Sequence, residues 1–230
     1  MKGVFNLRPA IPRYRVTWNP DIVLQFLESW HPPPNITLKQ LTQKTALLLV
    51  LLSGRRGNSI INLLKDNVSF HDNEVHISIG ELTKTSSVGR HEPEIILASF
   101  QNKTLCIVEY LQAYFKATEN FRGSSPHLLL SFVDPHKGIT TSTLSRWVRE
   151  VMSQSGIDIN RFRPHSTRSA AASHAAHRNV SLATILASVG WRSQSTFARH
   201  YNKPLLKNQG EFSKAMEPST RGKDFPFILR

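Results

Sequence analysis

The segment HSTRSAAASHAAHRNVSLATILASVGWRSQSTFARHYNKP occupies residues 165–204 and has the pattern of several short helices in series. Its first part follows a proline, which favours the opening position of a helix, so a helix is expected over residues 165–178. Ser181 can cap the next helix, and Gly190 is suited to end it. A further short helix is expected over residues 194–201. This part of the chain is therefore predicted to be entirely helical.

Upstream of this segment the pattern is again mostly helical, with one group of short strands. Asn19-Pro20-Asp21 combines a cap residue, a proline and an acid, which favours a helix start. Thr37 can cap a second helix whose apolar end should be buried. Strand-forming runs at NVSF, EVHISIG and EIIL predict a small antiparallel sheet. Other helices are expected at residues 57–64, 104–118 and 141–153, so the fold class is α+β, mostly helical with a small three-stranded sheet.

Charge is concentrated in one part of the chain. The 230 residues carry a net charge of +13. Residues 137–203 alone hold 10 basic and 2 acidic side chains. Such an excess favours an acidic partner, most often nucleic acid. We interpret this stretch as a phosphate-facing surface.

Several other classes of protein do not fit the composition. A single cysteine, Cys106, excludes a disulfide scaffold and is expected to be buried. The longest apolar run, residues 46–52, is far shorter than the roughly 20 residues of a membrane span. The N-terminal residues lack a hydrophobic signal region. We expect a soluble intracellular protein without a membrane partner.

Common catalytic motifs are missing as well. The sequence contains no GxxxxGK[ST], GxGxxG or HExxH motif, which argues against nucleotide-binding loops and zinc proteases. His174 and His177 share a helix face but lack further ligands at zinc-site spacing. Glu150 and Asp158 are the acids of the basic stretch, and they form no cluster for a two-metal nuclease. We therefore expect no metal, no cofactor and no small-molecule substrate.

Four segments together can act on a phosphodiester without metal. They are Ser53-Gly54-Arg55-Arg56, Lys84 in a hairpin, His165-Ser166-Thr167-Arg168, and Gly190-Trp191 with Tyr201 ten residues later. Two guanidiniums can bind the non-bridging oxygens and stabilise the transition-state charge. A tyrosine can attack phosphorus covalently, and a lysine or histidine can protonate the leaving oxygen.

In these motifs the chain resembles the catalytic domain of the tyrosine recombinases, the phage integrase family. It is similar to the eukaryotic branch carried by DIRS-like and related mobile elements. The resemblance covers nearly the whole chain, and residues 165–204 are its most specific part. It implies a protein that breaks and rejoins double-stranded DNA through a 3′-phosphotyrosine, with neither metal nor ATP. It also implies a homo-tetramer on DNA and, in a eukaryote, a nuclear location.

The resemblance assigns roles residue by residue. Arg56 and Arg168 would hold the scissile phosphate, and Lys84 would be the general acid toward the 5′ oxygen. His165 would assist proton transfer. Trp191 would pack and donate a hydrogen bond from its indole, and Tyr201 would be the nucleophile.

Some assignments have rivals within the sequence. Arg55 is the main alternative to Arg56, and Tyr14, Tyr110 and Tyr114 are alternatives to Tyr201. Ser59 stands where the family often has an acidic residue. The helix over 141–153 is a candidate for entry into a DNA groove, and its expected contact residues are Ser142, Ser145, Arg146 and Arg149.

The expected organisation has three parts. Residues 1–19 form an N-terminal segment or linker that is too short for the domain that usually precedes this one. Residues 20–205 form the catalytic domain, and residues 206–230 form a tail that can dock on a neighbouring protomer. Two other functions remain open on the sequence. They are a non-catalytic DNA-binding remnant of a mobile-element recombinase and a type IB topoisomerase-like activity.

Overall fold

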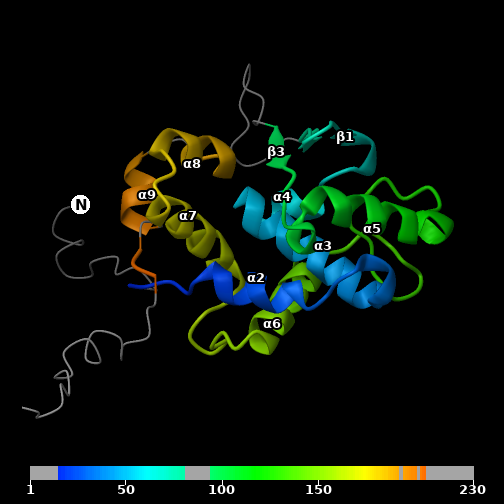
Figure 1. Ribbon diagram of the computed structural model, residues 1–230, viewed down its shortest axis with the longest axis horizontal. Coiled ribbons are helices and arrows are strands. Elements are labelled where there is room, and N and C mark those ends of the chain that lie inside the picture. Colours follow the sequence, from blue (N-terminus) through cyan, green and yellow to red (C-terminus); the bar gives the residue numbers. More distant parts are fainter. Residues whose placement is uncertain (1–14, 81–93, 192–193, 201–202, 206–230) are drawn as a thin grey trace, which may run out of the picture.

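The computed structural model describes residues 15–80, 94–191, 194–200 and 203–205. Within these ranges a helical body stands beside a small sheet (Figure 1). The helices are α2 (Pro20–Glu28), α3 (Leu38–Ser53), α4 (Gly57–Ile61), α5 (Ile107–Arg122), α6 (Thr141–Gln154), α7 (Thr167–His177), α8 (Leu182–Val189) and α9 (Gln194–His200). Short 3-10 turns are η1 (Pro33–Asn35), η2 (Lys65–Asn67), η3 (Lys103–Leu105) and η4 (Pro164–Ser166).

The caps predicted from the sequence start the helices in the structure. The side chain of Asn19 accepts a hydrogen bond from a backbone N–H in the first turn of α2. Thr37 and Gln40 form a reciprocal capping box at the start of α3. Ser181 accepts a hydrogen bond of 3.1 Å from the backbone N–H of Thr184 at the start of α8. Each cap satisfies a backbone donor that the helix itself cannot pair.

The predicted sheet is confirmed. It has the antiparallel order β1 (Val68–Phe70), β2 (Glu74–Ile77) and β3 (Ile95–Ala98). The register pairs Phe70 with Val75 and Ile77 with Ile95. In β3 alternate residues are buried, as expected for a strand with one face on the core.

Helix α3 lies at the centre of the body. Most of its residues are buried, and it contacts α5, α6, α7 and β3. The main hydrophobic core surrounds it, whereas a smaller apolar cluster joins Ala172, Ile185, Val189, Trp191 and Phe197. Helices α7 to α9 therefore form a lobe with its own small core, at one end of the molecule (Figure 1). None of the described helices has the length and apolar character needed to cross a bilayer.

Several predicted helices begin or end at other residues in the structure. The helix expected over 165–178 begins as the 3-10 turn η4, a common feature of helix N-termini. The helix expected over 104–118 starts at Ile107, because Asn102 caps the turn η3 just before it, and it continues to Arg122. The short helix expected over 57–64 already ends at Ile61. The predicted C-terminal tail, residues 206–230, lies outside the described residues.

Candidate active site

The first arginine pair lies where α3 ends and the chain turns. Gly54 has a φ of +59°, a left-handed conformation that ends α3 and that side chains rarely adopt. Arg55 and Arg56 follow immediately, and Arg56 is the N-cap residue of α4. The two side chains differ in environment, because Arg55 is buried and Arg56 is exposed.

The second pair, His165 and Arg168, lies at the start of α7. His165 is part of the turn η4, and Arg168 is in the first turn of the helix. Two hydrogen bonds hold this turn. The indole of Trp18 donates to the Ser166 hydroxyl at 2.8 Å, and the Thr167 hydroxyl donates to the Pro164 carbonyl at 2.8 Å. The turn is therefore attached to the N-terminal part of the body.

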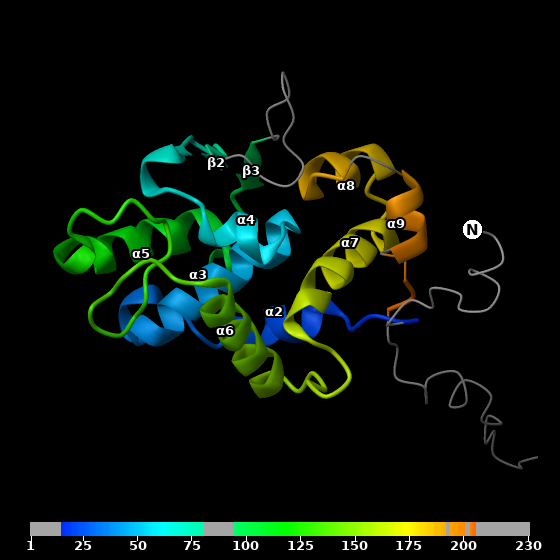
Figure 2. The ribbon, with the colours of Figure 1, turned by 180° about the vertical axis from the view of Figure 1, so that it is seen from behind.

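Arg56, His165 and Arg168 come together around one cavity of about 90 Å³. Its walls come from the α3–α4 turn, from α6 and from the η4–α7 turn, which lie side by side in Figure 2. Arg55 lines the same cavity, and its described lining contains no acidic side chain. A small, strongly cationic cavity of this kind suits an anion such as a phosphodiester.

Electrostatics favour the neutral form of His165. Burial, followed by the positive charges of Arg168 and Arg56, lowers the pKa of the His165 imidazole below its ordinary value. The imidazole is then uncharged near neutral pH and can accept a proton.

Arg168 connects this cavity to the end of α8. It is almost fully buried, and its Nη2 donates to the Val189 carbonyl at 2.8 Å. Its guanidinium also lies 4.8 Å from the centre of the Trp191 ring. Trp191 packs in turn on Phe197 of α9, with 5.8 Å between the ring centres. The structure thus brings Trp191 to Arg168.

The two remaining predicted site residues, Lys84 and Tyr201, lie outside the described residues. Described residues that follow Tyr201 in the chain, Lys203 and Pro204, are hydrogen-bonded to the rest of the molecule. Tyr201 directly follows α9, and the backbone N–H of Lys203 donates to the Ser173 hydroxyl at 3.2 Å. The backbone N–H of Thr17 donates to the Pro204 carbonyl at 2.9 Å.

The rival tyrosines have structural roles where they are described. Tyr110 and Tyr114 are fully buried in α5. Burial raises the pKa of Tyr110 to about 12 and also raises that of Tyr114, which makes both poor nucleophiles. Tyr14 lies outside the described residues.

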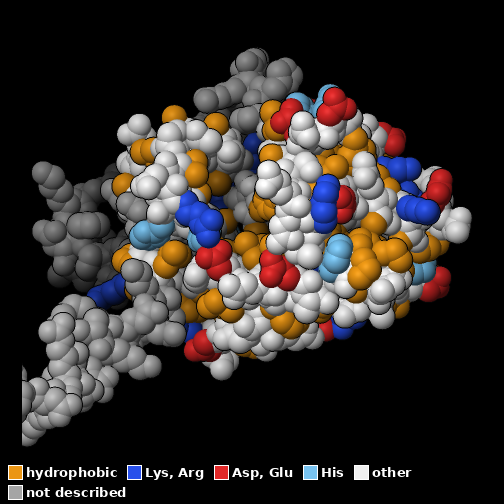
Figure 3. Space-filling model, in the orientation of Figure 1, with side chains coloured by type: hydrophobic (Ala, Val, Ile, Leu, Met, Phe, Trp, Pro, Cys, Tyr) orange, Lys and Arg blue, Asp and Glu red, His pale blue; other side chains and the backbone are white. Residues whose placement is uncertain are grey.

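Helix α6 presents the predicted DNA-contact residues beside the cavity. Ser142, Arg146 and Arg149 are exposed, whereas Ser145 is half-buried and lines the cavity itself. The opposite face of the molecule shows acidic and basic side chains mixed together (Figure 3). The role of the exposed α6 arginines as phosphate contacts stays a prediction.

The burial of two charged side chains, Arg55 and Lys44, was not predicted from the sequence. Arg55 was weighed only as an alternative to Arg56, and nothing in the sequence indicated that it would be buried. Lys44 is fully buried within α3, where it donates to the Leu27 and Trp30 carbonyls and to the Tyr110 hydroxyl. A lysine next to an apolar run was the signal available for it.

The histidines that were considered for metal have other partners. His174 Nε2 lies 3.5 Å from a carboxylate oxygen of Asp21, and His177 Nε2 lies 3.3 Å from the Lys203 carbonyl. Within the described ranges, no three His, Cys, Asp or Glu side chains are placed to hold a metal ion. Cys106 is buried, as predicted.

Comparisons with known proteins agree with the geometry. Residues 23–207 match the model of the phage integrase family. No curated protein sequence matches the chain.

Solved structures share the fold at low sequence identity. The XerH site-specific recombinase, in a pre-cleavage complex with its difH substrate, is 16% identical with a TM-score of 0.64 over 87% of this chain and 52% of that one. The XerA recombinase is 19% identical with a TM-score of 0.60, over 93% of this chain and 68% of that one. A lambda integrase dimer bound to a COC′ core site is 16% identical with a TM-score of 0.54, over 100% and 55% of the two chains. The chain spans about half the length of the XerH chain.

Proposed function

Because the chain belongs to the phage integrase family, we propose that it cleaves and rejoins DNA strands through a covalent 3′-phosphotyrosine at Tyr201. The partner is double-stranded DNA. In support, XerH has been solved with its difH substrate and lambda integrase with a COC′ core site. A lambda integrase structure is a tetramer on a Holliday junction, and we extend the proposal to a homo-tetramer during strand exchange. Origin in a DIRS-like mobile element and action in a nucleus belong to the same proposal.

The observation that carries the proposal is the cavity shared by Arg56, His165 and Arg168. A phosphodiester seated there meets two guanidiniums, each able to donate two parallel hydrogen bonds. The same donors stabilise the additional negative charge of a pentacoordinate phosphorus. Loss of one such donor typically costs about 3 kcal/mol of transition-state stabilisation.

The chemistry proceeds by exchange of one phosphoester for another. The Tyr201 oxygen attacks phosphorus, its proton passes toward His165, and the bond from phosphorus to the 5′ oxygen breaks. Lys84 gives a proton to that leaving oxygen. In the reverse step a 5′-hydroxyl attacks the phosphotyrosine and releases Tyr201. The number of phosphoester bonds is unchanged throughout, so no ATP is consumed.

One observation favours a second candidate, a DNA-binding remnant without catalysis. Ser59, half-buried in α4, stands where the family often has an acid that orients its neighbours. A serine cannot supply that charge. A chain that binds DNA and forms no covalent product would fit this alternative.

The deciding experiment traps the covalent intermediate. The full chain is incubated, with excess chelator, with a pool of nicked duplexes that have a randomised centre and lose a short 5′ fragment on cleavage. We expect a protein–DNA adduct that survives denaturation, is removed by protease and maps to Tyr201 by mass spectrometry. Tyr201→Phe should abolish the adduct and retain DNA binding. An adduct that persists in Tyr201→Phe contradicts the assignment.

Two further outcomes separate the alternatives. Binding of the pool without any adduct would favour the remnant. Adduct formation with relaxation of supercoiled plasmid, and without junction products, would favour a topoisomerase-like activity.

A further inference from the structure

Two helix C-termini meet end to end beside the candidate active site. Helix α3 ends at Gly54 and helix α8 ends at Gly190, which has a φ of +70°. A Cβ added at Gly54 would lie 2.6 Å from Cγ1 of Val189. A Cβ added at Gly190 would lie 2.5 Å from Nη1 of Arg55. Each glycine therefore permits close approach of a residue from the other helix end.

Two buried guanidiniums hold this end of α8. The exposed fractions of Arg55 and Arg168 are both 3%. Arg168 donates to the Val189 carbonyl, and Arg55 lies against Gly190, the next residue. The C-terminus of a helix carries partial negative charge, so cations are favourable there. Burial of Arg55 is accordingly linked to the position of the α8 end.

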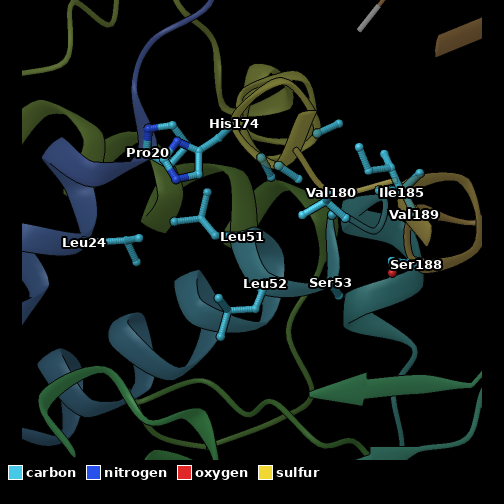
Figure 4. Close-up of a pocket in the computed structure, with 14 residues that line it drawn as sticks. Pro20, Leu24, Leu51, Leu52, Ser53, His174, Val180, Ile185, Ser188 and Val189 are labelled. Atoms are coloured by element: carbon cyan, nitrogen blue, oxygen red, sulfur yellow. The ribbon is translucent and has the colours of Figure 1, made fainter. Parts of the chain in front are cut away.

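The packing around this contact is incomplete. An apolar cavity of about 230 Å³ lies between α3 and the α7–α8 lobe. In Figure 4, Leu51 and Ser53 approach it from α3, while Ile185 and Val189 approach it from α8. Side chains of α3 and of α8 are therefore not closely packed along this cavity. The direct contacts of Gly54 with Val189 and of Arg55 with Gly190 gain importance for that reason.

We propose that Arg55 is a positioning residue that holds the α8 C-terminus and Trp191 in register with Arg56 and Arg168. Arg56, the predicted phosphate ligand, is the next residue along the chain. Trp191 follows Gly190 directly and leads into α9 and the Tyr201 segment. One side chain thus connects the two halves of the site. The catalytic consequence rests on the proposed function, whereas the structural consequence does not.

The structural consequence can be measured by NMR on the full chain without DNA. Each of the four tryptophans has one indole N–H resonance, and Trp191→Phe identifies that of Trp191. In Arg55→Met we expect the Trp191 resonance to move or broaden, while those of Trp18, Trp30 and Trp147 remain. Arg55→Lys keeps the positive charge, so its Trp191 indole resonance should lie closer to the wild-type chemical shift than that of Arg55→Met. If Arg55→Met does not fold, Arg55→Lys carries the test, with a smaller displacement of the same resonance.

Arg122→Met is the matched control. Arg122 is also a buried arginine, 6% exposed, and it donates to the His127 and Leu128 carbonyls. It lies at the end of α5, at the opposite side of the molecule from α8 and α9 (Figure 1). This variant should leave the Trp191 resonance in place. An unchanged Trp191 resonance in a folded Arg55 variant, or an equal displacement in Arg122→Met, overturns the proposal.

The catalytic consequence is measured by adduct formation. Arg55→Met should form the adduct on the order of tenfold more slowly, because small misplacements of reacting groups are costly. Because Arg55 also lines the cavity, its loss removes a nearby positive charge, so the rates are compared at saturating DNA. A displaced Trp191 resonance with an undiminished rate would refute the catalytic part. Absence of any adduct in the wild type would contradict the proposed function, and the NMR result would still decide the role of Arg55.

Discussion

The guanidinium of Arg168 lies 4.8 Å from the centre of the Trp191 ring and donates to the carbonyl of Val189, two residues before that ring. A cation over an aromatic face is held without using all its N–H donors. Arg168 is thereby oriented by contacts with the last residue of α8 and with the ring of Trp191. The position of Trp191 therefore affects the orientation of Arg168, the predicted phosphate ligand.

Substitution of Trp191 should affect cleavage in a graded way. Trp191→Phe keeps an aromatic face beneath Arg168 but weakens the interaction by about 1 kcal/mol, so we expect adduct formation to slow roughly fivefold. Trp191→Ala removes the face and should be slower still. DNA affinity should change little in both variants. Equal rates for Trp191→Phe and Trp191→Ala would show that the ring face does not orient Arg168.

The titration of His165 should report the two nearby arginines. Burial and the charges of Arg168 and Arg56 lower the pKa of His165, so its imidazole should titrate below its ordinary value of 6.5. Arg168→Gln removes one positive charge and should raise the pKa, although burial remains. The measurement is a ¹³C-edited NMR titration without DNA, with His165→Gln to assign the signal. A wild-type pKa at or above 6.5 would contradict the geometry of the cavity.

Local relationships in the site could be predicted from the sequence, whereas those that depend on packing could not. His165 and Arg168 are three residues apart at a helix start, so their proximity follows from helix geometry. The caps at Asn19, Thr37 and Ser181 are equally local. Arg55 is different, because a charged residue in a turn is normally solvated. Its burial depends on Gly190, more than a hundred residues away.

Lys44 illustrates the same limit. The apolar end of its helix predicted burial of α3, but the acceptors for the ammonium are the carbonyls of Leu27 and Trp30 and the hydroxyl of Tyr110. These groups come from α2, the turn after it and α5, and no pattern in the sequence places them together. The register of these helices is a tertiary property.

The buried ammonium of Lys44 should make stability depend on pH. Burial lowers its pKa from 10.5 to about 7. Between these values the unfolded chain binds a proton that the folded chain does not, so the free energy of unfolding should rise with pH in this window. In Lys44→Met the free energy of unfolding should therefore rise less steeply with pH than in the wild type. Urea denaturation at several pH values between about 7 and 10 measures it.

The control for this comparison is Lys116→Met, at an exposed position of α5. It removes one lysine charge from the surface and should retain the wild-type slope. The measurements stop below pH 10, because Tyr110 begins to lose its proton in the unfolded chain above that pH. Burial raises its pKa in the folded chain to about 12, so this tyrosine would make the free energy of unfolding fall as the pH rises further. The prediction would be refuted if the free energies of unfolding of wild type and Lys44→Met differed by the same amount at every pH in this range.

Binding to a random-sequence duplex should depend on salt through helix α6. The logarithm of the binding constant falls against the logarithm of the salt concentration by about 0.9 per phosphate contacted. Replacing the exposed Arg146 and Arg149 with glutamine should flatten that slope by about 1 to 2. The paired control replaces Lys103 and Lys116, both exposed near or on α5, and should leave the slope unchanged. Equal flattening in both double variants would exclude α6 as the specific phosphate contact.

Lys84 can be tested by a change in the leaving atom. If its ammonium protonates the 5′ oxygen, Lys84→Ala should cleave DNA about 10²- to 10⁴-fold more slowly than wild type. The substrate is a duplex with the sequence recovered from the covalent adduct. A substrate with sulfur in place of that bridging oxygen expels a thiolate, which needs no proton, so the variant should recover on it. Arg168→Ala is the matched control, because it loses transition-state stabilisation and should remain slow on both substrates. The measurement is the single-turnover rate of adduct formation on the two duplexes. Equal defects of Lys84→Ala on oxygen and sulfur would assign Lys84 to phosphate binding instead of proton transfer.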